Sequence, residues 1–177
     1  MVKFGVVSDT HITSNDDPDK IQILLQQINS IFDDMDEIIH AGNIYSKSFL
    51  NELEKIAPTT AIKGNLDYIE NLQSFVKISA GKYNIGVIHE LPDHIEDFFK
   101  ENNLHILIHG HTHIPLIQGT KFNALLLNPG SPTKPKAPPK KPLFREPIAR
   151  PTVITLEIDE NDILKTFIVN LRYKIQF

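Results

Sequence analysis

The stretch VKFGVVSDTH, residues 2–11, guides the interpretation of the whole chain. Its first part, Val2–Ser8, is rich in β-branched residues and ends in polar ones, which predicts a short buried strand. Asp9 and His11 follow this strand directly. Side chains two residues apart point the same way on an extended backbone, so we expect the carboxylate and the imidazole to converge. Asp9 alone would equally suit a loop-capping residue, so the surrounding pattern has to decide.

Helices and strands alternate after this first strand. Asp17-Pro18 opens a helix, with proline in its first turn, and apolar residues then recur at spacings of three and four up to Phe32. This strand–helix–strand order predicts a parallel sheet covered by helices. The predicted elements are helices at about 17–32 and 46–56 and strands at 37–40 and 59–63.

The second half of the chain is richer in strands. We expect these strands to form a second sheet packed against the first, with a hairpin around Asp159–Asp162 closing the chain. The fold class is therefore α/β. The predicted elements are strands at 73–78, 83–89, 105–109, 114–118, 122–127, 153–158 and 163–169, and a helix at about 93–102.

The amino-acid composition excludes several classes of protein and of site. The 177 residues are 41% hydrophobic, enough for a sizeable core, and we expect a single domain over residues 1–177. The absence of cysteine excludes a disulfide scaffold, a thiolate nucleophile and a cysteine-held metal. A net charge of −4 argues against a general polyanion binder. No apolar run is long enough for a signal segment or a membrane span, so we expect a cytoplasmic protein without membrane contact.

One segment, residues 129–151, has a biased composition. It holds eight of the 12 prolines and six of the 18 basic residues. Proline fixes φ and removes a donor, which predicts an extended surface loop. Such a loop is either an ordinary solvated one or a flap that contacts an anionic substrate or a neighbouring subunit. Phe144 is its only aromatic residue, so the sequence gives no strong indication of nucleic-acid binding.

Polar side chains follow five of the predicted strands. Ligands of open α/β sheets bind beyond the carboxyl ends of the strands. Imidazole and carboxylate together suit Zn, Mn, Fe, Ni or Co better than Mg or Ca. Each residue is common singly, but their combination predicts a metal site. The candidates are Asp9, His11, Asn43, Asn65, His89, His111 and His113, whereas His40, His94, His105 and His109 fit no ligand pattern and are assigned structural or supporting roles.

With these residues the sequence resembles the calcineurin-like metallophosphoesterases, most closely their small single-domain prokaryotic phosphodiesterases. The resemblance runs from the first strand to the last and implies a four-layer α/β/β/α sandwich with two mixed sheets. The most specific segments are GHTH and NPGS, while the Gly-Asn pairs are less so. The matching motifs are D-x-H at 9–11, Gly-Asn at 42–43 and 64–65, His89, GHTH at 110–113 and NPGS at 128–131.

The resemblance also implies a centre of two divalent ions. One would be held by Asp9, His11 and His113, and the other by Asn65, His89 and His111, with Asn43 as the bridging ligand; Asn43 and Asn65 would also be the catalytic residues. Mn²⁺ is the expected metal, with Fe, Ni, Co or Zn as alternatives. A metal-activated hydroxide would attack the phosphorus of a phosphate-ester small molecule or nucleotide. The family often forms dimers or tetramers, which leaves a homo-oligomer open.

Two positions depart from the family pattern. Asn43 stands where the family usually has aspartate, so a neutral amide replaces a bridging carboxylate and the second metal should bind more weakly. Leu66 stands where many members have the histidine that protonates the leaving group. We therefore expect a phosphodiesterase weakened at its bridge. The alternative is a catalytically impaired scaffold or binding module, because the small scaffold subunit of the retromer coat has asparagine at the same position.

Overall fold

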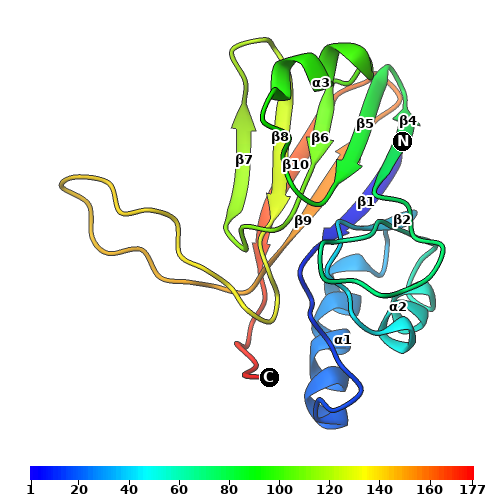
Figure 1. The fold of residues 1–177 in the computed structure, drawn as a ribbon, viewed down its shortest axis with the longest axis vertical. Helices are drawn as coiled ribbons and strands as arrows, with labels where there is room; N and C mark the ends of the chain where they lie inside the picture. Colours follow the sequence, from blue (N-terminus) through cyan, green and yellow to red (C-terminus); the bar gives the residue numbers. More distant parts are fainter.

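Two five-stranded sheets packed face to face form the body of the protein, which is described over residues 1–177 by a computed structural model (Figure 1). None of the helices is long and apolar enough to cross a membrane. The elements are β1 (Val2–Val7), α1 (Pro18–Phe32), β2 (Glu37–His40), α2 (Lys47–Glu54), β3 (Thr59–Ala61), β4 (Phe75–Ala80), β5 (Tyr83–Ile88), α3 (Ile95–Glu101), β6 (Ile106–Ile108), β7 (Pro115–Gly119), β8 (Leu125–Pro129), β9 (Thr152–Ile158) and β10 (Leu164–Asn170).

The first sheet has the strand order β10-β9-β1-β2-β3 and the second β4-β5-β6-β8-β7. The strands β1, β2 and β3 are parallel, as predicted, and β9 joins β1 in antiparallel fashion. The placement of the closing hairpin was wrong, because β9 and β10 return to the first sheet instead of extending the second. The crossovers through α1 and α2 place β2 and β3 on one side of β1, which leaves its other edge free for β9.

Four layers result, as the resemblance implied. The space between the sheets is filled by alternate residues of the strands, including Val6, Ile39, Ile85 and Ile154. The outer face of the first sheet is covered by α1 and α2, and Phe99 of α3 packs on the outer face of the second. The layers bring the carboxyl ends of the parallel strands to one edge of the molecule.

Local sequence explains where the helices begin. The carboxylate of Asp17 accepts a hydrogen bond from the backbone N–H of Asp19 (3.0 Å), and Pro18 occupies the first turn of α1. Ser46 caps α2 through a hydrogen bond from Phe49 N. That helix ends at Glu54, two residues before the predicted end, where the chain turns toward β3.

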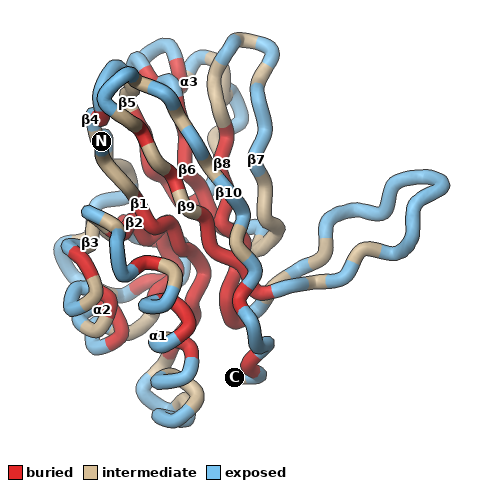
Figure 2. The backbone as a smooth tube through the Cα atoms, turned by 180° about the vertical axis from the view of Figure 1, so that it is seen from behind, coloured by how far each residue is buried: buried red, intermediate tan, exposed pale blue.

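The segment between β8 and β9 contains no strand or helix. Most of it, residues 134–150, leaves the body as a long extended arm (Figures 1 and 2). This agrees with the predicted surface loop, and we refer to residues 134–150 as the arm.

Candidate metal centre

The loops after β1 and β2 run side by side and present the first candidate residues. The N–H of Asp9 donates to Gly42 O and that of His11 to Asn43 O, both at 3.0 Å. Asp9, His11 and Asn43 all have left-handed backbone conformations, with φ of 53°, 49° and 58°. Such conformations cost about 1–3 kcal/mol each and cluster at functional sites. The extended backbone that we expected for Asp9 and His11 was therefore wrong, and their convergence comes from this turn geometry.

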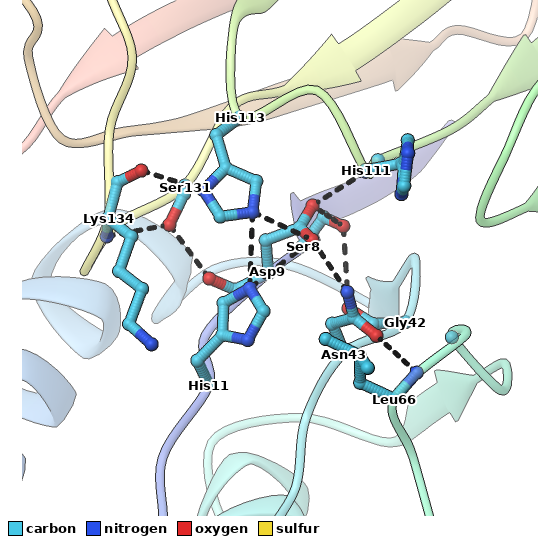
Figure 3. A network of polar contacts seen from close by, with 12 residues as sticks. Ser8, Asp9, His11, Gly42, Asn43, Leu66, His111, His113, Ser131 and Lys134 are labelled. Carbon is cyan, nitrogen blue, oxygen red and sulfur yellow. Dashed lines mark hydrogen bonds and ion pairs between the residues drawn. The ribbon is translucent and has the colours of Figure 1, made fainter.

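Three side chains meet at one point (Figure 3). His113 Nε2 lies 3.3 Å from Asp9 Oδ1 and 3.1 Å from His11 Nε2, and His11 Nε2 lies 3.6 Å from Asp9 Oδ1. Two ligands each about 2.1 Å from one cation are about 3.0–3.4 Å apart for angles between 90° and tetrahedral. Two of the observed separations fall within this range and the third, 3.6 Å between His11 Nε2 and Asp9 Oδ1, is slightly longer, so the three atoms are close to the spacing of ligands that share one ion.

The imidazole rings are oriented for this role. His113 Nδ1 donates to Lys134 O and His89 Nδ1 to Ala41 O, both at 2.7 Å, so the Nε2 atom of each ring carries a lone pair. His89 Nε2 is buried without a hydrogen-bond partner, 3.8 Å from Asp9 Oδ1, and His11 Nδ1 is likewise unpartnered. Buried unpaired nitrogens are costly, and a divalent ion near Asp9 fits this donor set.

Asp9 supplies the anionic charge. Burial raises the pKa of its carboxyl, but hydrogen bonding with His11 and His113 and the nearby His89 together hold that pKa far below its usual range. Its Oδ2 accepts hydrogen bonds from Ser8 Oγ (2.7 Å) and from the N–H of His111 (2.9 Å). The other oxygen, Oδ1, is thereby turned toward the imidazoles.

Asn43 lies against Asp9 with its amide in a defined orientation. Its Nδ2 donates to Asp9 Oδ1 (3.3 Å), and its Oδ1 accepts from the N–H of Leu66 (3.1 Å). Rotating the amide by half a turn would set oxygen against oxygen and N–H against N–H. This side chain thus completes the polar network around Asp9 (Figure 3).

Asp67 fixes the loops on both sides of Asn43. One carboxylate oxygen accepts the N–H groups of Asn43 (2.8 Å) and Gly64 (2.9 Å), and the other accepts those of Ile44 and Tyr45 (both 2.8 Å). From the sequence alone, Asp67 is interpreted more readily as a turn carboxylate than as the acid missing at Leu66. Its reach from the loop after β3 to the loop after β2 was missed, because Asp67 and Asn43 are far apart in the chain.

Of the remaining candidates, Asn65 and His89 line a neighbouring pocket, and His111 lies next to its residues His89 and Glu90. The imidazole of His111 is 40% exposed, with Nε2 3.7 Å from Glu90 Oε1, and its ring centroid is 5.4 Å from that of His89. His111 and His113 therefore do not point the same way, although side chains two residues apart would do so on an extended backbone. The pocket, of about 420 Å³, is lined by Lys63, Gly64, Asn65, Ser74, Phe75, Ile88, His89, Glu90, Pro92 and Phe98.

Residues after β8 hold the Asp9 loop in place. Ser131 Oγ donates to Asp9 O (2.7 Å), and Thr133 Oγ1 donates to Thr10 O (2.9 Å). The amide of Asn128 donates to Gly110 O (2.9 Å). The motif NPGS was noticed in the sequence, but these roles were not assigned to it; a Pro-Gly turn directly after a strand was the available indication.

The four other histidines have structural environments. His40 accepts from the N–H of Gly42 (3.2 Å) and contacts Thr10 Oγ1 (3.0 Å), and burial lowers its pKa to about 4. Burial also lowers the pKa of His109 to about 4. His94 precedes α3, and His105 Nδ1 accepts from Asn84 N (2.9 Å). None of the four belongs to the group of side chains that could hold an ion.

Comparisons of the sequence with a family model and with known proteins agree on one family. The model of the calcineurin-like phosphoesterase superfamily domain matches residues 2–161. A probable metallophosphoesterase of Methanocaldococcus jannaschii is 38% identical over 143 residues, which cover 77% of this chain and 71% of that protein. A probable metallophosphoesterase of Methanothermobacter thermautotrophicus is 34% identical over 164 residues, which cover 88% and 85%.

Solved structures share the fold. A predicted phosphoesterase from Streptococcus pneumoniae has a TM-score of 0.71 at 20% identity and covers 98% of this chain and 92% of its own. Vps29 of Entamoeba histolytica in complex with Zn²⁺ has a TM-score of 0.69 at 23% identity, with coverages of 96% and 99%. A structure described as a novel archaeal phosphodiesterase has a TM-score of 0.67 at 21% identity, with coverages of 95% and 100%.

Proposed function

This chain belongs to the calcineurin-like phosphoesterase superfamily, and from that premise we propose that it is a metal-dependent phosphodiesterase. The observation that carries the proposal is the group formed by Asp9, His11 and His113, whose spacing and lone pairs suit one divalent ion. The pocket of about 420 Å³ beside His89 and Asn65 gives a phosphate ester a place next to that ion.

The residues of this chain have distinct roles in the proposed reaction. When bound, a divalent ion such as Mn²⁺ supplies Lewis-acid stabilisation of charge on the phosphoryl oxygens. Asp9, His11 and His113 would hold the first ion, and Asn65, His89 and His111, beside Asn43, would contribute to a weaker second position. Lys63, on the wall of the pocket, attracts the anionic ester toward His89 and Asn65.

The leaving group receives no proton from the position after Asn65. Leu66 occupies that position, and its backbone N–H is already donated to Asn43 Oδ1. A leaving group that is stable as an anion needs no such acid. The enzyme therefore favours activated aryl diesters over alkyl phosphomonoesters.

The direct test is hydrolysis of bis(p-nitrophenyl) phosphate with and without added Mn²⁺. We expect turnover that depends on Mn²⁺, disappears in an Asp9→Asn variant and increases in an Asn43→Asp variant. Asn123→Asp is a matched control, because it makes the same change at an exposed left-handed asparagine in the β7–β8 turn. Absence of turnover in both the natural chain and the Asn43→Asp variant would contradict the proposal.

A second candidate, a binding module on the same fold, is favoured by one observation. The Asn43 amide pairs with Asp9 and with the N–H of Leu66, so these polar groups are satisfied by contacts within the protein and do not require an ion. This function predicts that a protein partner binds equally well with and without EDTA. Mn²⁺-dependent turnover by the natural chain would decide for the enzyme.

A further inference from the structure

We propose that the arm binds a second copy of this chain and forms a two-fold dimer in which the arms are exchanged. The receiving surface is a patch on the first sheet formed by Asp34, Met35, Thr155, Glu157 and Phe167. We call this surface the β9–β10 patch. Three features of the arm and the properties of the patch support the pairing.

The first feature is the apolar tip of the arm. The side chain of Leu143 is fully exposed, and Phe144 and Ile148 are 70% and 71% exposed. The tip lies far from both sheets (Figures 1 and 2). Burying one such side chain is worth about 1.5–3 kcal/mol, so an arm that displays three of them gains by binding an apolar surface outside its own chain.

The second feature is the backbone conformation of the tip. Phe144 N donates to Lys141 O (3.2 Å), which closes a turn with Pro142 and Leu143 at its centre. Leu143 has φ of 68°, the left-handed position that a turn of this kind normally gives to glycine or asparagine. A bulky residue there costs about 1–2 kcal/mol. The turn projects Leu143 outward without a compensating contact in its own chain.

The third feature is charge. The arm has six basic residues and one acidic residue, a net charge of +5. The remaining chain has 12 basic and 21 acidic residues, a net charge of −9. Opposite charges on the arm and the body favour association between copies, and this attraction weakens with salt.

The β9–β10 patch has the matching properties. Phe167 is 61% exposed on the edge strand β10, and it lines a hollow of about 190 Å³ whose floor also includes Met35 and Leu156. The other lining residues are Lys3, Asp34, Thr155, Glu157 and Lys165. A cavity of about 150 Å³ holds a benzene ring, so the hollow can receive the ring of Phe144. The acidic residues at the rim of the hollow are paired within the chain, Asp34 with Lys3 and Glu157 with Lys165 (3.2 Å), so the attraction for the arm comes from the net charge of the body and the hollow itself supplies the apolar contact.

The mass of the protein in solution tests the proposal. We expect light scattering after size exclusion to give twice the chain mass of 20.1 kDa at low salt and a smaller mass at high salt. A Leu143→Asn/Phe144→Ser variant should be monomeric and should melt at the temperature of the natural chain at high salt, where the dimer has dissociated, because asparagine suits the left-handed turn. The control Tyr68→Ser/Tyr173→Ser, which removes exposed aromatic surface elsewhere, should remain dimeric.

A mixing experiment tests the pairing of the arm with the patch. Phe167→Ser should also be monomeric, while its own arm remains intact. Mixed with the Leu143→Asn/Phe144→Ser chain, it should form a heterodimer through the one intact arm–patch contact. A monomeric natural chain, or a dimer that survives both sets of substitutions, would overturn the proposal; monomeric variants that fail to associate on mixing would overturn the choice of patch.

Discussion

Replacing Asn43 by aspartate should make the stability of the protein depend strongly on metal. The amide now donates to Asp9 Oδ1 across 3.3 Å. A carboxylate there would place two like charges about 3.3 Å apart, a repulsion of about 5 kcal/mol at an effective dielectric constant of about 20. The new carboxyl can avoid this repulsion by binding a proton. At pH 7 this requires its pKa to rise from about 3.9 by about 3 units, which costs about 4 kcal/mol, so the destabilisation does not exceed that value.

The expected result has a definite sign with pH. The folded-state pKa of the new carboxyl is raised, so the destabilisation is absent below about pH 4 and grows as pH increases toward 7. At neutral pH in EDTA, the melting temperature should fall by roughly 8–16 °C for a chain of this size. Mn²⁺ should restore it, because an ion between the two carboxylates replaces repulsion by attraction.

The assay is thermal unfolding of the natural chain and of Asn43→Asp, each in EDTA and in Mn²⁺, at pH 5 and pH 7. Asn123→Asp serves as the control for adding one negative charge at an exposed position. The reasoning is refuted if the variant in EDTA is as stable as the natural chain. It is also refuted if Mn²⁺ raises the melting temperature of both proteins equally.

Three further predictions concern the surroundings of the centre. Asp67→Asn should lower the free energy of unfolding in urea by about 2–4 kcal/mol, because one amide oxygen cannot accept four N–H groups and its NH₂ faces two of them. His40 and His109 have folded-state pKa values lowered to about 4, so their contribution to stability is complete above about pH 6.5 and is lost as pH falls toward 4. The free energy of unfolding measured in urea should fall by up to about 3 kcal/mol for each histidine over that pH range, and His109→Gln should remove about half of this pH dependence. Leu66→His should restore a leaving-group acid and increase the rate on an alkyl phosphomonoester such as glycerol 1-phosphate relative to p-nitrophenyl phosphate by about 100-fold, because only the alkoxide needs a proton to leave; an unchanged ratio would contradict the assigned role of that position.

The sequence predicted the elements better than their partners. The strand at Glu37–His40 was placed with its observed bounds because an apolar run between polar turns is a local feature. The pairing of β9 with β1 joins residues about 150 positions apart, such as Val2 and Ile158, and depends on which edge the crossovers leave free. Local periodicity does not contain that information.

The same distinction applies to the candidate centre. Its residues could be collected from the strand ends, because the topology of a parallel sheet brings those ends to one edge. The directions of the side chains could not be predicted. The backbone is left-handed at Asp9, His11, His111 and His113, and the two-residue period of an extended strand does not describe it. His111 consequently faces Glu90, while His113 faces Asp9.

The charges of the proposed ligands determine how strongly each of the two ion positions should bind metal. Asp9 is the only anionic side chain among the proposed ligands, and its Oδ1 faces His11, His113 and the Asn43 amide. Two divalent ions about 4 Å apart repel each other by about 17 kcal/mol at an effective dielectric constant of about 20. A bridging carboxylate would offset much of this repulsion by attracting both ions, whereas an amide presents a neutral oxygen, which here already accepts the N–H of Leu66. The arrangement therefore favours one well-held ion at Asp9 over an equal pair.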